Sequence, residues 1–118
     1  MSGPAIDAAA FDHLIEITGG DLGFMDELVD TYLGDADLQL DALRAAVAAG
    51  DDAAIMRPAH TLKSSSQNVG ALGLAEQCRS LEADARAGSV PDAAARVAAC
   101  ASTFEVVRTE LLEKRIGR

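Results

Sequence analysis

The sequence is short of several residue types that particular classes of protein need. It has no Trp, and only 10 Lys and Arg stand against 19 Asp and Glu, which gives a formal net charge of −9. A nucleic-acid binder needs a basic surface to displace counterions, so this balance argues against nucleic acid as a partner. It argues equally against an anionic membrane surface. No apolar run approaches ~20 residues, so we expect no membrane-spanning segment.

Signals for secretion, disulfides and zinc are also scarce. The N-terminal residues Met1–Pro4 have neither a basic nor an apolar character, so we expect no secretory signal and a cytoplasmic protein. Two cysteines, Cys78 and Cys100, set no disulfide framework. Together with His13 and His60, they have none of the paired short spacings of structural zinc sites. Both cysteines fall within apolar helical patterns, which predicts that they are small buried hydrophobic residues.

Helical periodicity is what the sequence does have. A chain of 118 residues fits one domain, and we treat residues 1–118 as that domain. Glycines that suit helix ends divide it into five segments, which we expect to be helices over about 7–17, 21–49, 51–69, 71–87 and 91–116. Asp7, Asp21 and Asp51 stand where N-caps belong, and Pro91 fits the first turn of the last helix.

The last four segments carry the pattern of a helical bundle. Apolar residues recur in them at steps of three and four, and in the segment over 21–49 this stripe keeps its phase across Gly34 and Asp35. Loops of two to five residues force neighbouring helices to run antiparallel. The predicted fold is therefore all-α, a monomeric antiparallel up-down-up-down four-helix bundle. The short additional N-terminal helix is expected to cap one end.

One stretch of the third segment combines side chains that can take part in a chemical reaction. His60 lies one position from the apolar stripe, and Lys63, Ser64 and Gln67 follow at i+3, i+4 and i+7, which places all four on one helix face. No acid occurs over 53–75, so the face is locally cationic and suits an anion such as a phosphoryl group. Imidazole is a nucleophile near neutral pH. Spacing alone leaves open that His60 is a boundary residue without a role.

The same stretch resembles the histidine-containing phosphotransfer (HPt) domain. The family motif combines a His, a Leu-Lys pair, a run of small residues and an apolar-Gly pair, followed by a helix that ends in Leu-Glu or Leu-Gln. Residues 59–71 match it, continued by Leu74, Cys78, Leu81 and Glu82. The resemblance implies that His60 takes a phosphoryl group from an aspartyl phosphate of one receiver domain and passes it to the aspartate of another.

The resemblance also implies roles for the neighbouring residues. Lys63 matches the lysine that helps to hold the phosphoryl oxygens, and Glu82 matches the residue that holds the imidazole ring. Ser64 stands where the family often has Gly, a departure that keeps access because Ser is small, and that could slow transfer. Gln67 is the weaker match, as a polar contact of the phosphoryl group. If Glu82 accepts a hydrogen bond from Nδ1 of His60, the other ring nitrogen is left as the nucleophile.

The implied partners are receiver domains of response regulators and hybrid histidine kinases. The protein is then no enzyme with its own ATP site, because no Gly-rich phosphate loop is present. We expect no intrinsic cofactor, with Mg²⁺ and the attacked aspartate on the receiver. Exposed apolar residues such as Leu22, Phe24 or Leu72 are predicted to form the centre of the docking surface.

Other helical proteins with a histidine fit less well. The acceptor His of a kinase dimerisation bundle is usually followed by an acid, whereas Thr61 follows here, and no Glu precedes either His by three residues as a di-iron bundle requires. The alternative that stays open is a helical-bundle adaptor in which His60 is not phosphorylated.

Overall fold

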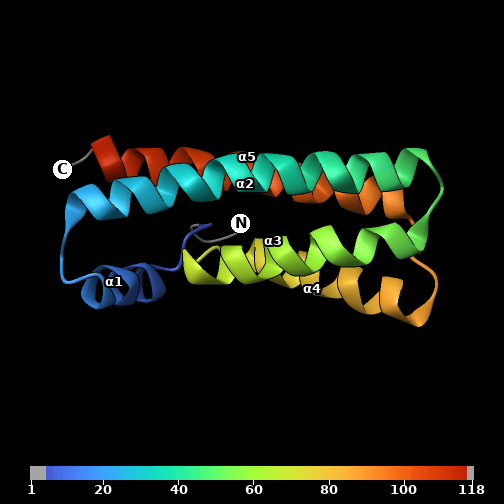
Figure 1. The fold of residues 1–118 in the computed structure, drawn as a ribbon, viewed down its shortest axis with the longest axis horizontal. Coiled ribbons are helices and arrows are strands. Elements are labelled where there is room, and N and C mark those ends of the chain that lie inside the picture. The colour runs from blue at the N-terminus through green and yellow to red at the C-terminus, as the bar shows by residue number, and fades with distance from the viewer. Residues whose placement is uncertain (1–4, 117–118) are drawn as a thin grey trace.

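The structure is a computed structural model that describes residues 5–116, and every regular element within this range is helical (Figure 1). The expected lack of a secretory signal in residues 1–4 and the two ends of the predicted domain lie outside the described residues. The elements in chain order are α1 (Ala8–Ile17), α2 (Leu22–Ala48), the 3-10 helix η1 (Asp52–Ile55), α3 (Met56–Asn68), α4 (Leu72–Ala87) and α5 (Ala93–Ile116).

The four longest helices form the predicted antiparallel bundle. Each packs against two others, in the order α2, α3, α4, α5 and back to α2. Figure 1 shows α2 beside α5 in one layer and α3 beside α4 in the other. At 1.5 Å per residue, the 27 residues of α2 span about 40 Å and the 13 residues of α3 about 20 Å. The layer of α3 and α4 therefore leaves space at one end, and α1 lies there as the predicted cap.

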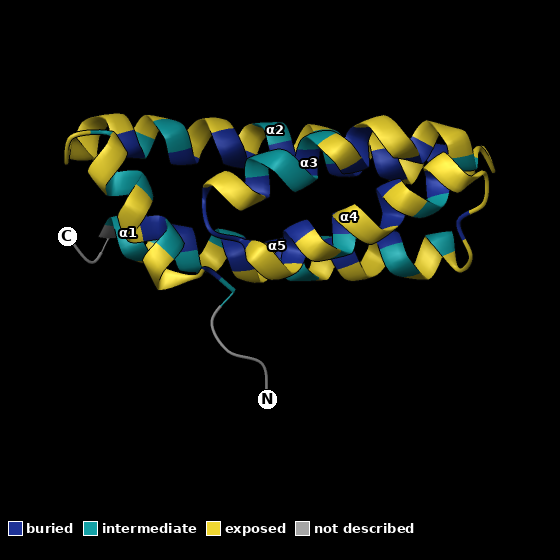
Figure 2. Cartoon of the chain, turned by 90° about the horizontal axis from the view of Figure 1, so that it is seen from below, coloured by how far each residue is buried: buried dark blue, intermediate teal, exposed yellow. Residues whose placement is uncertain are grey.

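The core follows the predicted apolar stripes (Figure 2). Helix α2 runs unbroken past Gly34, so its stripe faces the bundle along its whole length. Leu62 of α3 is fully buried, and burying a Leu side chain stabilises the fold by about 1.5–3 kcal/mol. Cys78 and Cys100 are both buried and form no disulfide, which confirms the prediction for them. The hydroxyl groups of Tyr32 and Ser66 satisfy each other inside this core at 2.8 Å, and burial raises the pKa of Tyr32 to about 12.

The helix starts and one sharp turn are fixed by local chemistry. Asp7, Asp21 and Asp51 each accept a hydrogen bond from the backbone N–H three residues later, so the three predicted N-caps are confirmed. Gly70 has a positive φ of 84°, and its carbonyl accepts a hydrogen bond of 2.7 Å from the N–H of Asp7. A Cβ at this position would lie 3.0 Å from the carbonyl oxygen of Asp7. The turn after α3 therefore approaches the start of α1 too closely for a side chain.

Two predicted helix starts are wrong in detail. The third segment begins with η1, and α3 starts only at Met56, because Pro58 has no N–H to donate to the carbonyl of residue 54. The last helix starts at Ala93, so Pro91 lies in a turn and not in the first helical turn. The reason is Asp92, whose φ of 54° is incompatible with a right-handed helix.

Candidate functional site

His60 lies at the edge between core and solvent, as its place beside the stripe predicts. Ala59 and Leu62 on the same helix are fully buried, because α3 packs along α4 over most of its length. This packing turns His60 outward, and its side chain is 57% exposed. The imidazole is therefore held by a rigid helix of the bundle and remains accessible to a partner.

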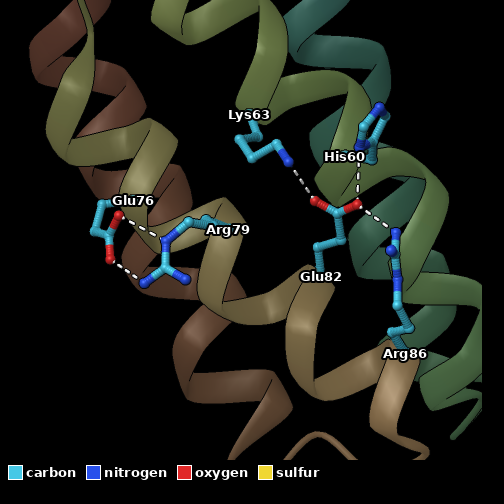
Figure 3. Close-up of polar contacts among 6 residues, drawn as sticks. All are labelled: His60, Lys63, Glu76, Arg79, Glu82 and Arg86. Carbon is cyan, nitrogen blue, oxygen red and sulfur yellow. Dashed lines mark hydrogen bonds and ion pairs between the residues drawn. The ribbon is translucent and has the colours of Figure 1, made fainter.

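Glu82 of α4 gathers three cationic or titratable side chains around one carboxylate (Figure 3). Its Oε2 lies 2.8 Å from Nδ1 of His60, and it also accepts a hydrogen bond of 2.8 Å from Nη2 of Arg86. Its Oε1 accepts a hydrogen bond of 2.7 Å from Nζ of Lys63. The Glu82 side chain is only 7% exposed. Helices α3 and α4 thus meet at a buried carboxylate whose two oxygens are both hydrogen-bonded.

The charge state of Glu82 decides the tautomer of His60. The hydrogen bond from Lys63 lowers the pKa of Glu82 below its ordinary value, with burial opposing this effect and the bond from His60 adding to it. The carboxylate is therefore ionised at neutral pH and can only accept hydrogen bonds. Nδ1 of a neutral His60 must then carry the proton, so Nε2 keeps its lone pair. The arrangement produces an oriented nucleophile.

The remaining predicted residues lie at different distances from this centre. The side chain of Lys63 is only 21% exposed, and its ammonium group is bonded to Glu82. Ser64 is half-buried one turn beyond His60. Gln67 lies seven residues from His60, about 10 Å along the helix axis, and the structure does not bring it to the ring.

Two arginines near His60 were not identified from the sequence. Arg86 follows Glu82 at i+4, a spacing that favours ion pairs on a helix and could have pointed to it. Arg57 precedes His60 by three residues. A cavity of about 220 Å³ beside the ring is lined by Met56, Arg57, His60, Glu82 and Arg86. The cationic character of the site is therefore stronger than the stretch around His60 alone indicates.

A larger groove runs between α1, α2 and α3. It has a volume of about 710 Å³, and its apolar lining includes Leu14, Ile17 and Leu28. Gln67 and His13, both exposed, also line it, so the groove extends from the end of the His60 face to the N-terminal helix.

The exposed apolar residues that were predicted to form the docking centre do not gather in one place. Leu22 lines a hollow against α5, whereas Leu72 lines another beside Gly70. Within residues 5–116, no group of three or more His, Cys, Asp or Glu side chains is arranged to hold a metal ion. No helix in the same range has the length and apolarity to cross a membrane.

Comparison with known proteins assigns the family. The family model described as Hpt domain matches residues 27–114. The crystal structure of histidine-containing phosphotransfer protein B (HptB) from Pseudomonas aeruginosa PAO1 is similar to this chain, with 32% sequence identity, a TM-score of 0.88 and coverage of 99% of each chain. No match was found among the curated proteins. With the four-helix bundle and the exposed, carboxylate-bound histidine already described, these matches establish that the chain belongs to the Hpt domain family.

Proposed function

We propose that His60 is the residue through which this histidine phosphotransfer protein carries a phosphoryl group between receiver-domain aspartates in a phosphorelay. Members of the Hpt family are phosphotransfer intermediates that interact with receiver domains, and they have no ATP site of their own. The observation that carries the assignment to His60 is its hydrogen bond to Glu82, 2.8 Å between Nδ1 and Oε2, on a side chain that is 57% exposed. His13 has no comparable carboxylate partner in the described part of the chain.

The geometry supports a simple displacement. The Nε2 lone pair of His60 attacks the phosphorus of an aspartyl phosphate, an N–P bond forms, and the O–P bond breaks to release the receiver's carboxylate. The proton on Nδ1 stays in place, so the ring becomes cationic, and the ionised carboxylate of Glu82 stabilises this charge. The reverse sequence delivers the group to the next aspartate. Phosphoryl transfer of this kind depends on positioning and charge stabilisation more than on proton transfer.

The receiver is proposed to dock over His60 and the groove between α1, α2 and α3. Along α2, Phe24, Leu28 and Leu38 fall on one helix face, and Phe24 and Leu38 are 46% and 66% exposed. Ile17 at the end of α1 is 65% exposed and lines the same groove. Exposed apolar side chains around a mostly apolar groove are typical of a protein interface. Of the three residues predicted to form the docking centre, Phe24 remains in this proposal. Leu28, Leu38 and Ile17 take the place of Leu22 and Leu72.

The remaining elements of the proposal concern the setting of the reaction. Mg²⁺ and the groups that activate the aspartate belong to the receiver, so this chain supplies one half of the reacting site and no intrinsic cofactor. The protein acts as a monomer in the cytoplasm, without nucleic acid or membrane as partner, and it meets receivers of response regulators and hybrid histidine kinases.

The experiment is incubation with a receiver that carries labelled aspartyl phosphate. Wild-type protein is expected to take up label that is acid-labile and base-stable, as a phosphoramidate is, whereas a serine ester at positions 64–66 survives acid. His60→Gln should take up none and remain folded, and His13→Gln, the matched control, should behave as wild type. A receiver that binds the wild-type chain without transferring label would favour the adaptor alternative. Label in His60→Gln would refute the assignment of the acceptor.

A further inference from the structure

The three side-chain cations around His60 differ in whether they already have a partner. Lys63 and Arg86 are both hydrogen-bonded to Glu82, at 2.7 and 2.8 Å. Arg57 is exposed, lines the cavity beside His60, and makes no hydrogen bond or ion pair with any residue in 5–116. Its guanidinium is therefore the cationic group of this cavity that is available to a new anion.

The position of Arg57 brings it to the reacting ring. It lies three residues before His60 on α3, and side chains at i and i+3 are neighbours on a helix surface, with Cβ atoms about 5–6 Å apart. The cavity that both residues line has a volume of about 220 Å³, whereas a water molecule takes about 30 Å³ of liquid volume. A phosphoryl group on the ring and a few water molecules fit into such a space.

Arg57 adds a positive charge to a cluster around His60 that is already positive. One carboxylate and the two cations bonded to it, Glu82 with Lys63 and Arg86, sum to a charge of +1. Arg57 raises this to +2, on a protein whose net charge is −9. A phosphoryl group on Nε2 brings up to two negative charges. Because the guanidinium is planar and carries several N–H donors, it matches phosphate oxygens in a bidentate manner.

We propose that Arg57 is a further catalytic residue, which binds the oxygens of the phosphoryl group as it moves onto and off His60. The inference rests on the proposed function, since it requires that His60 carries the group. Glu82 then acts on the ring through Nδ1, and Arg57 acts on the phosphoryl group on the other side of the reacting bond. Lys63 and Arg86 are hydrogen-bonded to the Glu82 carboxylate and hold it in place.

The test uses phosphoramidate, a small phosphoryl donor, so that no receiver surface is involved. Nε2 of His60 forms the N–P bond, the P–N bond of the donor breaks, and the protonated nitrogen of the donor leaves as ammonia. Phosphohistidine is followed by ³¹P NMR for wild type, Arg57→Ala and Arg57→Lys. Arg79→Ala is the matched control, because Arg79 is an exposed arginine of α4 that bonds Glu76 and lies outside the cavity (Figure 3).

Loss of a charge-assisted hydrogen bond to the phosphoryl group should slow phosphorylation by Arg57→Ala about tenfold. Arg57→Lys should recover part of the rate, and Arg79→Ala should match wild type. With a phosphorylated receiver as donor, the maximal rate should fall by the same factor and the half-saturating receiver concentration should stay unchanged. Circular dichroism checks the fold, and Arg57→Gln replaces Arg57→Ala if the latter unfolds.

The outcomes separate the inference from the proposed function. Arg57→Ala with the wild-type phosphoramidate rate overturns the inference, and so does a change confined to the half-saturating receiver concentration, because Arg57 would then contact the receiver. A wild-type protein that gains no phosphate on His60 from either donor overturns the proposed function, and the role of Arg57 with it.

Discussion

Replacing Glu82 with Gln tests whether one carboxylate both stabilises the bundle and activates His60. The substitution keeps the size and shape of the side chain and removes its charge. The carbonyl oxygen of Gln can still accept hydrogen bonds, but its NH₂ group is a donor. This group would face either the ammonium group of Lys63 or the donors of His60 and Arg86. At least one of the three hydrogen bonds is therefore lost.

The expected magnitude follows from the exposure of each partner. The side chains of His60 and Arg86 are 57% and 67% exposed, so solvent screens their contacts with Glu82, which contribute about 0–1 kcal/mol each. Lys63 is 21% exposed, and its charge-assisted bond to a buried carboxylate contributes about 1.5–3 kcal/mol. We expect Glu82→Gln to lower the free energy of unfolding by about 2 kcal/mol at pH 7. Transfer to His60 should slow about 10–100-fold, because the orienting and charge-balancing carboxylate is lost.

The pH dependence gives an independent check. The hydrogen bond from Lys63 lowers the pKa of Glu82 in the folded state, so the unfolded chain binds more protons between the two pKa values. The stabilisation by Glu82 is therefore complete above about pH 4.5, the ordinary value, and is lost as the pH falls through the folded pKa. Glu82→Gln has no carboxylate to titrate at this position, so the difference in stability between wild type and Glu82→Gln should shrink in acid.

Urea unfolding from pH 3 to pH 7, followed by circular dichroism, measures these differences. Glu82→Asp serves as a second variant, because it keeps the charge and shortens the reach by one methylene group. A Glu82→Gln protein with wild-type stability at pH 7 and the same pH profile would refute the stability argument. An unchanged rate of transfer would refute the role given to the carboxylate in activating His60.

Three further predictions concern single contacts. Lys63→Ala should lower the free energy of unfolding by about 1–3 kcal/mol and slow transfer, because it removes the cation that holds Oε1 of Glu82; urea unfolding and single-turnover transfer measure both effects, and two wild-type values would contradict it. Ser64→Gln should slow transfer from a receiver by its bulk at i+4 from His60 and leave the phosphoramidate rate unchanged; equal rates with the receiver would count against docking over this face. Gly70→Ala should lower the free energy of unfolding by about 1–2 kcal/mol, and with it the melting temperature, because it places a Cβ at a φ of 84° and 3.0 Å from the carbonyl oxygen of Asp7. An unchanged melting temperature would show that the turn can relax.

The helices could be predicted because their signals lie within a few residues of each other. The stripe of α2 keeps its phase across Gly34, and the aspartates at the helix starts accept hydrogen bonds from residues only three positions away. The helix starts differ from the prediction where a proline or an unusual backbone angle interrupts the helical hydrogen bonding. Pro58 breaks the α-helical hydrogen bonding at the start of the third segment, and the turn at Asp92 has a φ that no sequence pattern indicates.

The sequence by itself determined which face of α3 presents His60, since residues three, four and seven positions apart on one helix have a fixed relation. The resemblance of the motif to the HPt family added Glu82, which no periodicity connects to His60. Only the tertiary structure decided that Lys63 and Arg86 are bonded to Glu82, and that Arg57 lines the cavity beside the ring without a partner among residues 5–116. The physical reason is that contacts between α3 and α4 depend on the distance, angle and register of two packed helices, which the whole core sets together.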